Sequence, residues 1–445
     1  MKCAINYLIY LSIFILPFFS VPSSFSGERF ELRQAISFAL KNSPMLSAAR
    51  SGVNATKFQI KESKGRFLPQ ITGYAGYDRK SDPVVVVPIK GFGQKPPAFS
   101  RDQYRIGLSL IIPVYEGGRL RAKLDMARFS KEMEENSLSF TRQDLIANLI
   151  NVFNQALYLK ELEKARHTVL SALKKAQKDA RLKLKLGRIA PVELMRIDTQ
   201  VAQQEQELIS TIQSKKRALY ALSLLMGWDR TAPLEITGKL THEKSNPYLS
   251  KSFNELLNEA FEKRADILAA KAAVKKAEAE LRYEKGGHLP SLSLVGDYSR
   301  HAGSGLHYDE EVWSGGVSLS INIFSGGIIS AKVGEAASKL ERAHHLLREA
   351  KLRAKRQILD AISEIKEASH RLKVSKTALK TAKETYRIEQ LRYDTGAGTI
   401  TDALLAQSAW KEAIANELMA KYGLKKAFVD LKFALGVIDK EAGEN

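Results

Sequence analysis

Two short interruptions in long helical stretches hold the side chains that are best placed for chemistry in this chain of 445 residues. They read Leu186-Gly187-Arg188-Ile189-Ala190-Pro191-Val192-Glu193 and Thr395-Gly396-Ala397-Gly398-Thr399-Ile400-Thr401-Asp402. Glycine after a long helix is a typical C-cap, and Pro191 or Thr399 can begin the next helix. Glu193 and Asp402 each follow their glycine by six residues. This shared spacing predicts that both carboxylates lie in equivalent turns at the same end of the molecule.

Two interpretations of these carboxylates remain open. Glu193 and Asp402 can stabilise a helix N-terminus through the helix dipole, with Thr399 or Thr401 as the capping residue. If copies of the chain surround a common axis, the same carboxylates can form a ring of negative charge at a narrow opening. The two roles are compatible.

The rest of the sequence contains no recognisable catalytic, metal or cofactor motif. His344 and His345 are adjacent on a predicted helix, where neighbours do not share a face. There is no metal-ligand spacing, Gly-rich phosphate loop, nucleophile elbow or triad order. We therefore expect no enzyme, no metal site and no cofactor. The other histidines are scattered and include His242, His288, His301 and His307.

The formal net charge of +20 comes largely from Lys and Arg spread along the helical stretches. Such residues usually form a solvated face. A nucleic-acid-binding protein needs basic residues clustered with aromatic ones, or a recognisable reading motif, and neither is visible. We expect no nucleic-acid partner.

The elements that position the two turns are unusually long. Leu120 to Gly187 contains no proline and would form a helix of about 100 Å. Apolar residues recur in it at heptad spacing, which predicts lateral partner helices along its whole length. One such line consists of Leu138, Leu145, Val152 and Leu159.

A strand with one apolar face precedes each long helix. In Tyr104 to Ile112, the side chains of Ile106, Leu108, Leu110 and Ile112 alternate with Arg105, Gly107, Ser109 and Ile111. In Val312 to Ile323, one side carries Trp313, Val317, Leu319, Ile321 and Ile323. Apolar residues alternating with small or polar ones are typical of a lipid-facing barrel wall. Aromatic residues that suit a girdle at the membrane interface, or core packing, are Tyr74, Tyr77, Tyr104, Tyr298, Tyr308 and Trp313.

The chain is an internal duplication. The strand-end glycines Gly117 and Gly326 are offset by 209 residues (326 − 117), and the same offset relates Gly187 to Gly396 and Gly227 to Gly436. A register kept without a gap over this length predicts two copies of one structural unit.

These patterns predict the organisation of the whole chain. Residues 1–26 read as a signal peptide, because Lys2 precedes an apolar run too short to span a bilayer comfortably. The first repeat, 27–227, contains a helix, a hairpin at 69–112 and long helices at 119–186 and 191–226. An equatorial linker at 228–251 leads to the second repeat, 252–437. That repeat contains a helix, a hairpin at 290–323 and long helices at 328–395 and 400–436. A disordered tail is expected at 438–445.

Four strands of this length can cross a bilayer at a tilt, but four strands cannot close a barrel. An open sheet edge in lipid would leave backbone groups without hydrogen bonds. Several copies must therefore join, and the charged helices must extend into an aqueous compartment. The fold class expected is mostly α with membrane β.

The chain resembles the TolC-like outer membrane factor (outer membrane efflux protein) family over its whole mature length. The resemblance rests on the duplication, on the two turns, and on Pro113-Val114-Tyr115-Glu116-Gly117-Gly118 and Asn322-Ile323-Phe324-Ser325-Gly326-Gly327. It implies a homotrimer with a twelve-stranded β-barrel in the outer membrane that continues into a twelve-helix periplasmic α-barrel. The implied function is the passive exit duct of a tripartite efflux system. The implied partners are a periplasmic adaptor (membrane fusion) protein and an inner-membrane transporter of the RND, ABC or MFS type.

The resemblance also assigns roles to individual residues. Asp402, Glu193 and Leu405 are the candidates for the periplasmic gate. Gly398 stands where some members carry a gate arginine, and Leu405 replaces a second acidic residue, so a constriction of Asp402 beside apolar Leu405 is expected instead of a fully ionic latch. The adaptor-docking turns comprise Leu186, Gly187, Arg188, Thr395, Gly396 and Ala397. The residues expected to face outer-membrane lipid are Ile106, Leu108, Leu110, Val317, Leu319 and Ile321.

Two alternatives remain open. The first is a type I protein-secretion duct, which would use the same architecture. The architecture does not distinguish a polypeptide substrate from a small molecule. A periplasmic coiled-coil adaptor or scaffold without a pore would not need four amphipathic strands of bilayer length.

Overall fold

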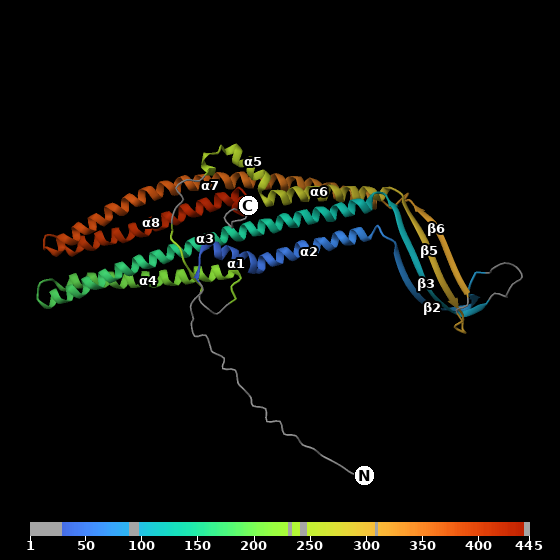
Figure 1. Ribbon diagram of the computed structural model, residues 1–445, viewed down its shortest axis with the longest axis horizontal. Coiled ribbons are helices and arrows are strands. Elements are labelled where there is room, and N and C mark those ends of the chain that lie inside the picture. Colours follow the sequence, from blue (N-terminus) through green and yellow to red (C-terminus); the bar gives the residue numbers. More distant parts are fainter. Residues whose placement is uncertain (1–28, 89–97, 230–233, 241–246, 308–309, 440–445) are drawn as a thin grey trace, which may run out of the picture.

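The long helices and the strands form two connected parts, a helical body and a sheet at one end of it (Figure 1). The computed structural model describes residues 29–88, 98–229, 234–240, 247–307 and 310–439. The expected signal peptide at 1–26 lies outside the described residues, as do Tyr308, His242 and residues 440–445 of the expected tail.

Two helices run most of the length of the helical body. α3 (Arg119–Lys185) and α7 (Ile328–Asp394) have 67 residues each, or about 100 Å. Each begins after a glycine in the left-handed region, Gly118 at φ 78° and Gly327 at φ 81°. Each is followed by a turn and a returning helix, α4 (Pro191–Met226) after α3 and α8 (Ile400–Ala434) after α7.

Four shorter helices complete the body, in two pairs that are broken at equivalent places. α1 (Leu32–Asn42) and α2 (Pro44–Gly65) are separated by Ser43, and α5 (Phe253–Lys263) and α6 (Ala265–Lys285) by Arg264. Proline at the start of α2 suits a helix N-terminus and cannot continue the helix before it.

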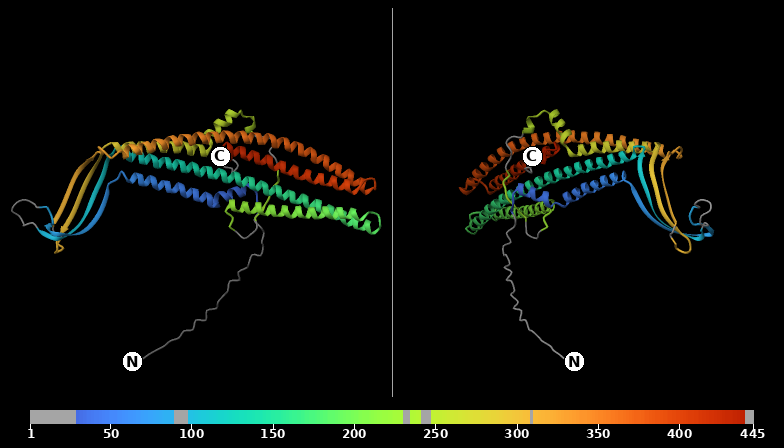
Figure 2. Two further views of the ribbon diagram at one scale, coloured as in Figure 1. Left: turned by 180° about the vertical axis from the view of Figure 1, so that it is seen from behind. Right: turned by 45° about the vertical axis from the view of Figure 1, so that its right-hand side comes forward.

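The returning helices end against these breaks. A Cβ atom on Gly227, at the end of α4, would lie 2.4 Å from the carbonyl oxygen of Asn42. A Cβ atom on Gly436, just after α8, would lie 3.0 Å from Cα of Arg264. α4 therefore continues in line with α2, and α8 with α6, while α5 stands away from the layer (Figures 1 and 2).

The sheet contains four antiparallel strands in the order β2-β3-β5-β6. They span Gln70–Val85, Phe99–Glu116, Ser291–Ala302 and Glu310–Ser320. β3 continues four residues past the expected end at 112, with a register shift between Pro113 and Tyr115. β6 ends at Ser320, so Ile321 lies one residue beyond the strand. Two-residue strands β1 (Arg29–Phe30) and β4 (Glu235–Ile236) pair in parallel, and short 3₁₀ turns occur at Pro247–Ser250 and Gly286–His288.

The register separates the aromatic residues between the two faces of the sheet. Tyr77 lies opposite Tyr104, and Tyr298 lies opposite Trp313, on the face that also carries Leu108. Tyr74 lies on the other face. Its ring covers Gly107, and its hydroxyl donates to the Asp297 carboxylate at 3.0 Å. Tyr74 therefore does not belong to a girdle on the apolar face.

The helices keep the order of the strands they follow. Beside the sheet, α3 packs between α2 and α6, and α6 packs against α7. Towards the far end, α3 packs between α4 and α8, and α8 packs against α7. One edge of the molecule thus consists of β2, α2 and α4, and the opposite edge consists of β6 and α7.

The core follows the helix seams. Leu149, Phe153 and Leu222 are buried where α1, α3 and α4 meet, and a second cluster joins α5, α7 and α8. The expected disordered tail at 438–445 begins too early. Ile438 is fully buried, and the carboxylate of Asp439 accepts a hydrogen bond from Gln143 at 2.9 Å. Within the described ranges, every helix is too short or too polar to span a lipid bilayer.

Candidate functional site

The two turns lie at the end of the molecule farthest from the sheet (Figure 1). Gly187 (φ 67°) and Gly396 (φ 78°) adopt the left-handed conformation that closes a Schellman motif. In the first turn the amide of Arg188 donates to the Lys183 carbonyl at 2.9 Å, and in the second the amide of Ala397 donates to the Arg392 carbonyl at 2.8 Å. The residues assigned to adaptor docking are all exposed: Leu186, Gly187, Arg188, Thr395, Gly396 and Ala397.

The structure brings the two turns together. The Arg196 guanidinium donates to the Thr401 hydroxyl, which links α4 to the first turn of α8. The Lys183 ammonium lies 4.8 Å from the centroid of the Tyr393 ring. A cleft of about 620 Å³ between the turns is lined by residues of both repeats. The equivalent segments of the duplication therefore form one site.

Asp402 is exposed and takes part in the N-terminal cap of α8. Its amide donates to the Thr399 hydroxyl at 3.2 Å, and that hydroxyl donates to Oδ2 of Asp402 at 2.7 Å. Thr399 is thus the capping residue, while the hydroxyl of Thr401 is engaged by Arg196. No ion pair of Asp402 is found among the described residues, so its negative charge faces solvent.

Glu193 is half-buried in the first turn of α4, where its amide donates to the Ala190 carbonyl at 3.0 Å. Burial is the main cause that raises the pKa of the Tyr393 phenol above its usual value, and the charges of Glu193 and Asp394 raise it further. Glu193 therefore acts electrostatically on the turn of the other repeat.

Leu405 and Gly398 lie on either side of Asp402 in the chain and differ in their surroundings. Leu405, one turn along α8, is 65% exposed. A Cβ atom on Gly398 would lie 2.9 Å from Cβ of Arg392. A larger residue at 398 would therefore require the turn to shift.

Sequence reasoning missed a polar cluster between the two repeats. Nζ of Lys411 on α8 lies 3.0 Å from Oε1 of Glu207 on α4, and Arg166 on α3 contacts the other oxygen of Glu207 at 3.6 Å. All three side chains are largely buried. They tie α8 to the α3–α4 pair above the turns. Heptad patterns give no signal for such a cluster, since they do not say which helices become neighbours.

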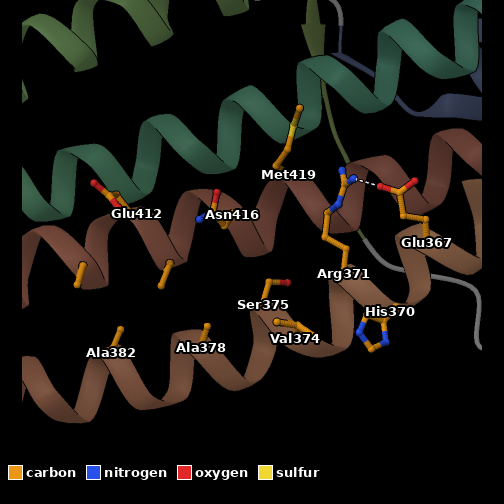
Figure 3. Close-up of a pocket in the computed structure, with 12 residues that line it drawn as sticks. Glu367, His370, Arg371, Val374, Ser375, Ala378, Ala382, Glu412, Asn416 and Met419 are labelled. Atoms are coloured by element: carbon orange, nitrogen blue, oxygen red, sulfur yellow. Dashed lines mark hydrogen bonds and ion pairs between the residues drawn. The ribbon is translucent and has the colours of Figure 1, made fainter.

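A groove of about 910 Å³ runs between α7 and α8 (Figure 3). Small side chains, including Ser375, Ala378 and Ala413, line its floor together with polar residues such as Glu412, and Met419 lies at one end. An ion pair between Arg371 and Glu367 lies at the rim. In the described part of the chain, no group of three His, Cys, Asp or Glu side chains could hold a metal ion.

The family profile described as Outer membrane efflux protein matches residues 35–228 and 256–437. The outer membrane efflux protein BepC of Brucella suis is 25% identical over 322 residues, which cover 70% of this chain and 64% of BepC, slightly under two thirds of its length. The alkaline protease secretion protein AprF of Pseudomonas aeruginosa is 22% identical over 414 residues, covering 90% of this chain and 83% of AprF.

The fold is that of solved outer-membrane channels. The crystal structure of the Campylobacter jejuni CmeC outer membrane channel superposes with a TM-score of 0.79 at 19% identity, covering 93% of this chain and 88% of CmeC. Because the family profile matches both repeats, this chain belongs to the outer membrane efflux protein family, whose members are outer-membrane channels with a periplasmic extension.

Proposed function

We propose that this protein is the outer-membrane exit duct of a tripartite efflux system. It is a passive channel that takes substrates from an inner-membrane transporter across the periplasm and the outer membrane. The observation that carries this proposal is the alignment of the open edges. β2, α2 and α4 form one edge of the molecule, and β6 and α7 form the other, so a closed ring of copies seals sheet and helices together.

The edges carry apolar residues that suit this closure. Ile209 and Leu224 on α4 are 60% and 80% exposed, and Leu352 and Val374 on α7 are 58% and 53% exposed. A head-to-tail interface closes into a ring when its rotation allows it. Three copies supply twelve strands, the number that the family resemblance implies. The same closure covers the groove beside Val374 (Figure 3).

One face of the sheet is suited to lipid. Ile106, Leu108, Val317 and Leu319 are exposed on it, and Leu110 is half-buried. Ile321 is exposed just beyond β6, where the strand meets the helical body. The opposite face, with Tyr74 and Asp297, would line the bore.

The two turns would form the closable inner end and the adaptor-docking surface. Repeated around the ring, Asp402 and Glu193 would place up to six carboxylates at the entrance, with Leu405 beside them. Opening would separate the contacts that join the repeats, Arg196–Thr401 and Lys411–Glu207.

Asp402→Ala tests the gate in planar bilayers. It should raise single-channel conductance and weaken block by multivalent cations added on the side of the turns. Thr399→Ala is the matched control, because it removes the cap and keeps the carboxylate. If Asp402→Ala leaves conductance and block at wild-type values, Asp402 is only a capping residue.

A polypeptide-secretion duct is the second candidate, favoured by the similarity to AprF over 90% of this chain. In-cell crosslinking at Arg188 and Ala397, followed by co-purification, should capture the adaptor and then an RND, ABC or MFS transporter. An ABC transporter with an adjacent protein substrate would favour secretion, and an RND or MFS pump would favour efflux.

A further inference from the structure

One face of α7 carries a line of lysines that lack acidic partners. The spacings of 11, 7, 3, 4 and 3 residues keep them on one side of a helix with 3.6 residues per turn. All are exposed, and within the described residues none forms an ion pair or a side-chain hydrogen bond. This lysine face consists of Lys355, Lys366, Lys373, Lys376, Lys380 and Lys383.

Several arginines of α7, in contrast, are paired with a carboxylate of the same helix. Three arginines have a carboxylate four residues away, as in the Arg371–Glu367 pair at the groove (Figure 3). The six lysines thus differ from these arginines, whose charge is balanced by a carboxylate on the same helix. Two further pairs of this kind are Arg353–Glu349 at 2.7 Å and Arg356–Asp360 at 3.2 Å.

The lysine face lies on the same side of the helical layer as α5. The ammonium of Lys351 lies 5.7 Å from the centroid of the Phe261 ring in α5, and Lys355 follows one turn later on the same face. α5 stands away from the helical layer (Figure 1). A conducting tube needs a free bore, so the α5 side is the exterior of the proposed duct.

We infer that the lysine face docks an acidic α-helix of the periplasmic partner protein, lying parallel to α7. From Lys355 to Lys383 the line extends about 42 Å along the helix axis. A second helix parallel to α7 could contact the whole line if it carried Glu or Asp at spacings of three, four and seven residues. An anionic polymer layer, the alternative ligand, would run parallel to the membrane and therefore perpendicular to α7. It would contact only a short part of the lysine face. The inference rests on the proposed duct and names the chemistry of its partner.

A defined peptide probe tests this inference on the purified full-length protein in detergent. The probe is a labelled helical peptide of about four heptads with Glu at heptad-spaced positions, and its control has the same composition with the Glu positions scrambled. The test variant combines Lys366→Gln, Lys373→Gln, Lys376→Gln and Lys380→Gln. The matched control removes four exposed lysines near the sheet: Lys57→Gln, Lys61→Gln, Lys64→Gln and Lys285→Gln.

Fluorescence anisotropy should show that the striped peptide binds the wild type and the control variant alike. An exposed ion pair changes affinity by a factor of about 1.4 to 5, so the test variant, which removes four lysines, should bind about fourfold or more weakly. Wild-type affinity in the test variant would overturn the inference. Equal binding of the scrambled peptide, or lysine-dependent retention on peptidoglycan sacculi, would overturn it in favour of a general polyanion site.

Single-channel conductance separates this inference from the duct itself. The test variant should conduct like the wild type, because the lysine face lies outside the bore. Lost peptide binding with unchanged conductance supports the inference. A wild-type protein that binds the striped peptide but does not conduct would refute the duct and leave the docking face standing.

Discussion

At the scale of single residues, Arg264 holds together the place where α8 meets α6. Its residue surface is 3% exposed, and its guanidinium donates to both oxygens of Asp266, at 3.0 and 2.7 Å, and to the Ala434 carbonyl at 2.9 Å. Guanidinium geometry matches a carboxylate in this way, so the charge is buried with its hydrogen bonds satisfied. It also caps the last turn of α8.

Arg264→Met should therefore lower the free energy of unfolding by about 3 to 5 kcal/mol, because it leaves Asp266 and a helix-end carbonyl without their partner. The matched control is Arg66→Met, whose pair with Glu62 at 2.8 Å is exposed and should cost at most about 1 kcal/mol. Denaturant titration of the helical circular dichroism signal measures both. Equal losses would contradict the role assigned to Arg264.

The sequence predicts the position of the two turns, but it does not predict the contact between the end of α8 and the start of α6 at Arg264. Gly187 and Gly396 follow long helical stretches and precede helix-starting residues, so their position and equivalence follow from local chemistry. Arg264 is one of many basic residues, and its partner carbonyl is 170 positions away. A hydrogen bond of that separation leaves no local pattern. The ion pair between Lys411 and Glu207 was not predicted for the same reason, because its two residues lie far apart in the sequence.

At the scale of elements, the end-to-end contacts of α4 with α2 and of α8 with α6 let pairs of shorter helices run alongside the long helices α3 and α7. α4 ends at Gly227, whose φ of 66° is in the left-handed region and whose missing side chain lets it approach Asn42. Gly436 repeats this at α8, with a φ of 70°. The duplication predicted equivalent glycines, whereas the end-to-end contact follows only from the tertiary structure.

Gly227→Ala should destabilise the protein more than Gly187→Ala. Both positions have positive φ, which costs alanine about 1 to 2 kcal/mol. Only at Gly227 would the added Cβ meet backbone at 2.4 Å, since nothing lies within 4 Å at Gly187. Repacking the joint should cost a further 1 to 3 kcal/mol or so. Thermal unfolding of the two variants in the same detergent compares them, and equal shifts would mean that the joint tolerates a side chain.

The strands and long helices were predictable for a simple reason. Alternating apolar residues in strands and heptads in helices indicate directly which face each element buries. The ends of the strands were predicted less accurately. β3 continues past 112 through a register shift at Pro113, and β6 stops before Ile321. The start of the tail was placed too early because Ile438 is buried in the core and Asp439 accepts a hydrogen bond from Gln143, and two residues show no periodicity.

At the scale of the whole molecule, one chain has two open edges, so it does not enclose a channel by itself. The sheet ends at β2 and β6, and the same two sides expose apolar residues on α4 and α7. Unpaired strand edges in lipid are costly because no water is available to bond their backbone groups. Family membership, edge alignment and the apolar helix seams all favour a ring of copies around a shared bore.

Native mass spectrometry of the mature protein, extracted from the outer membrane in detergent, tests this most directly. The predicted result is a species with the mass of three chains that remains intact when collisions remove the detergent micelle. A single-chain mass, with protein that stays dispersed without detergent, would contradict the duct.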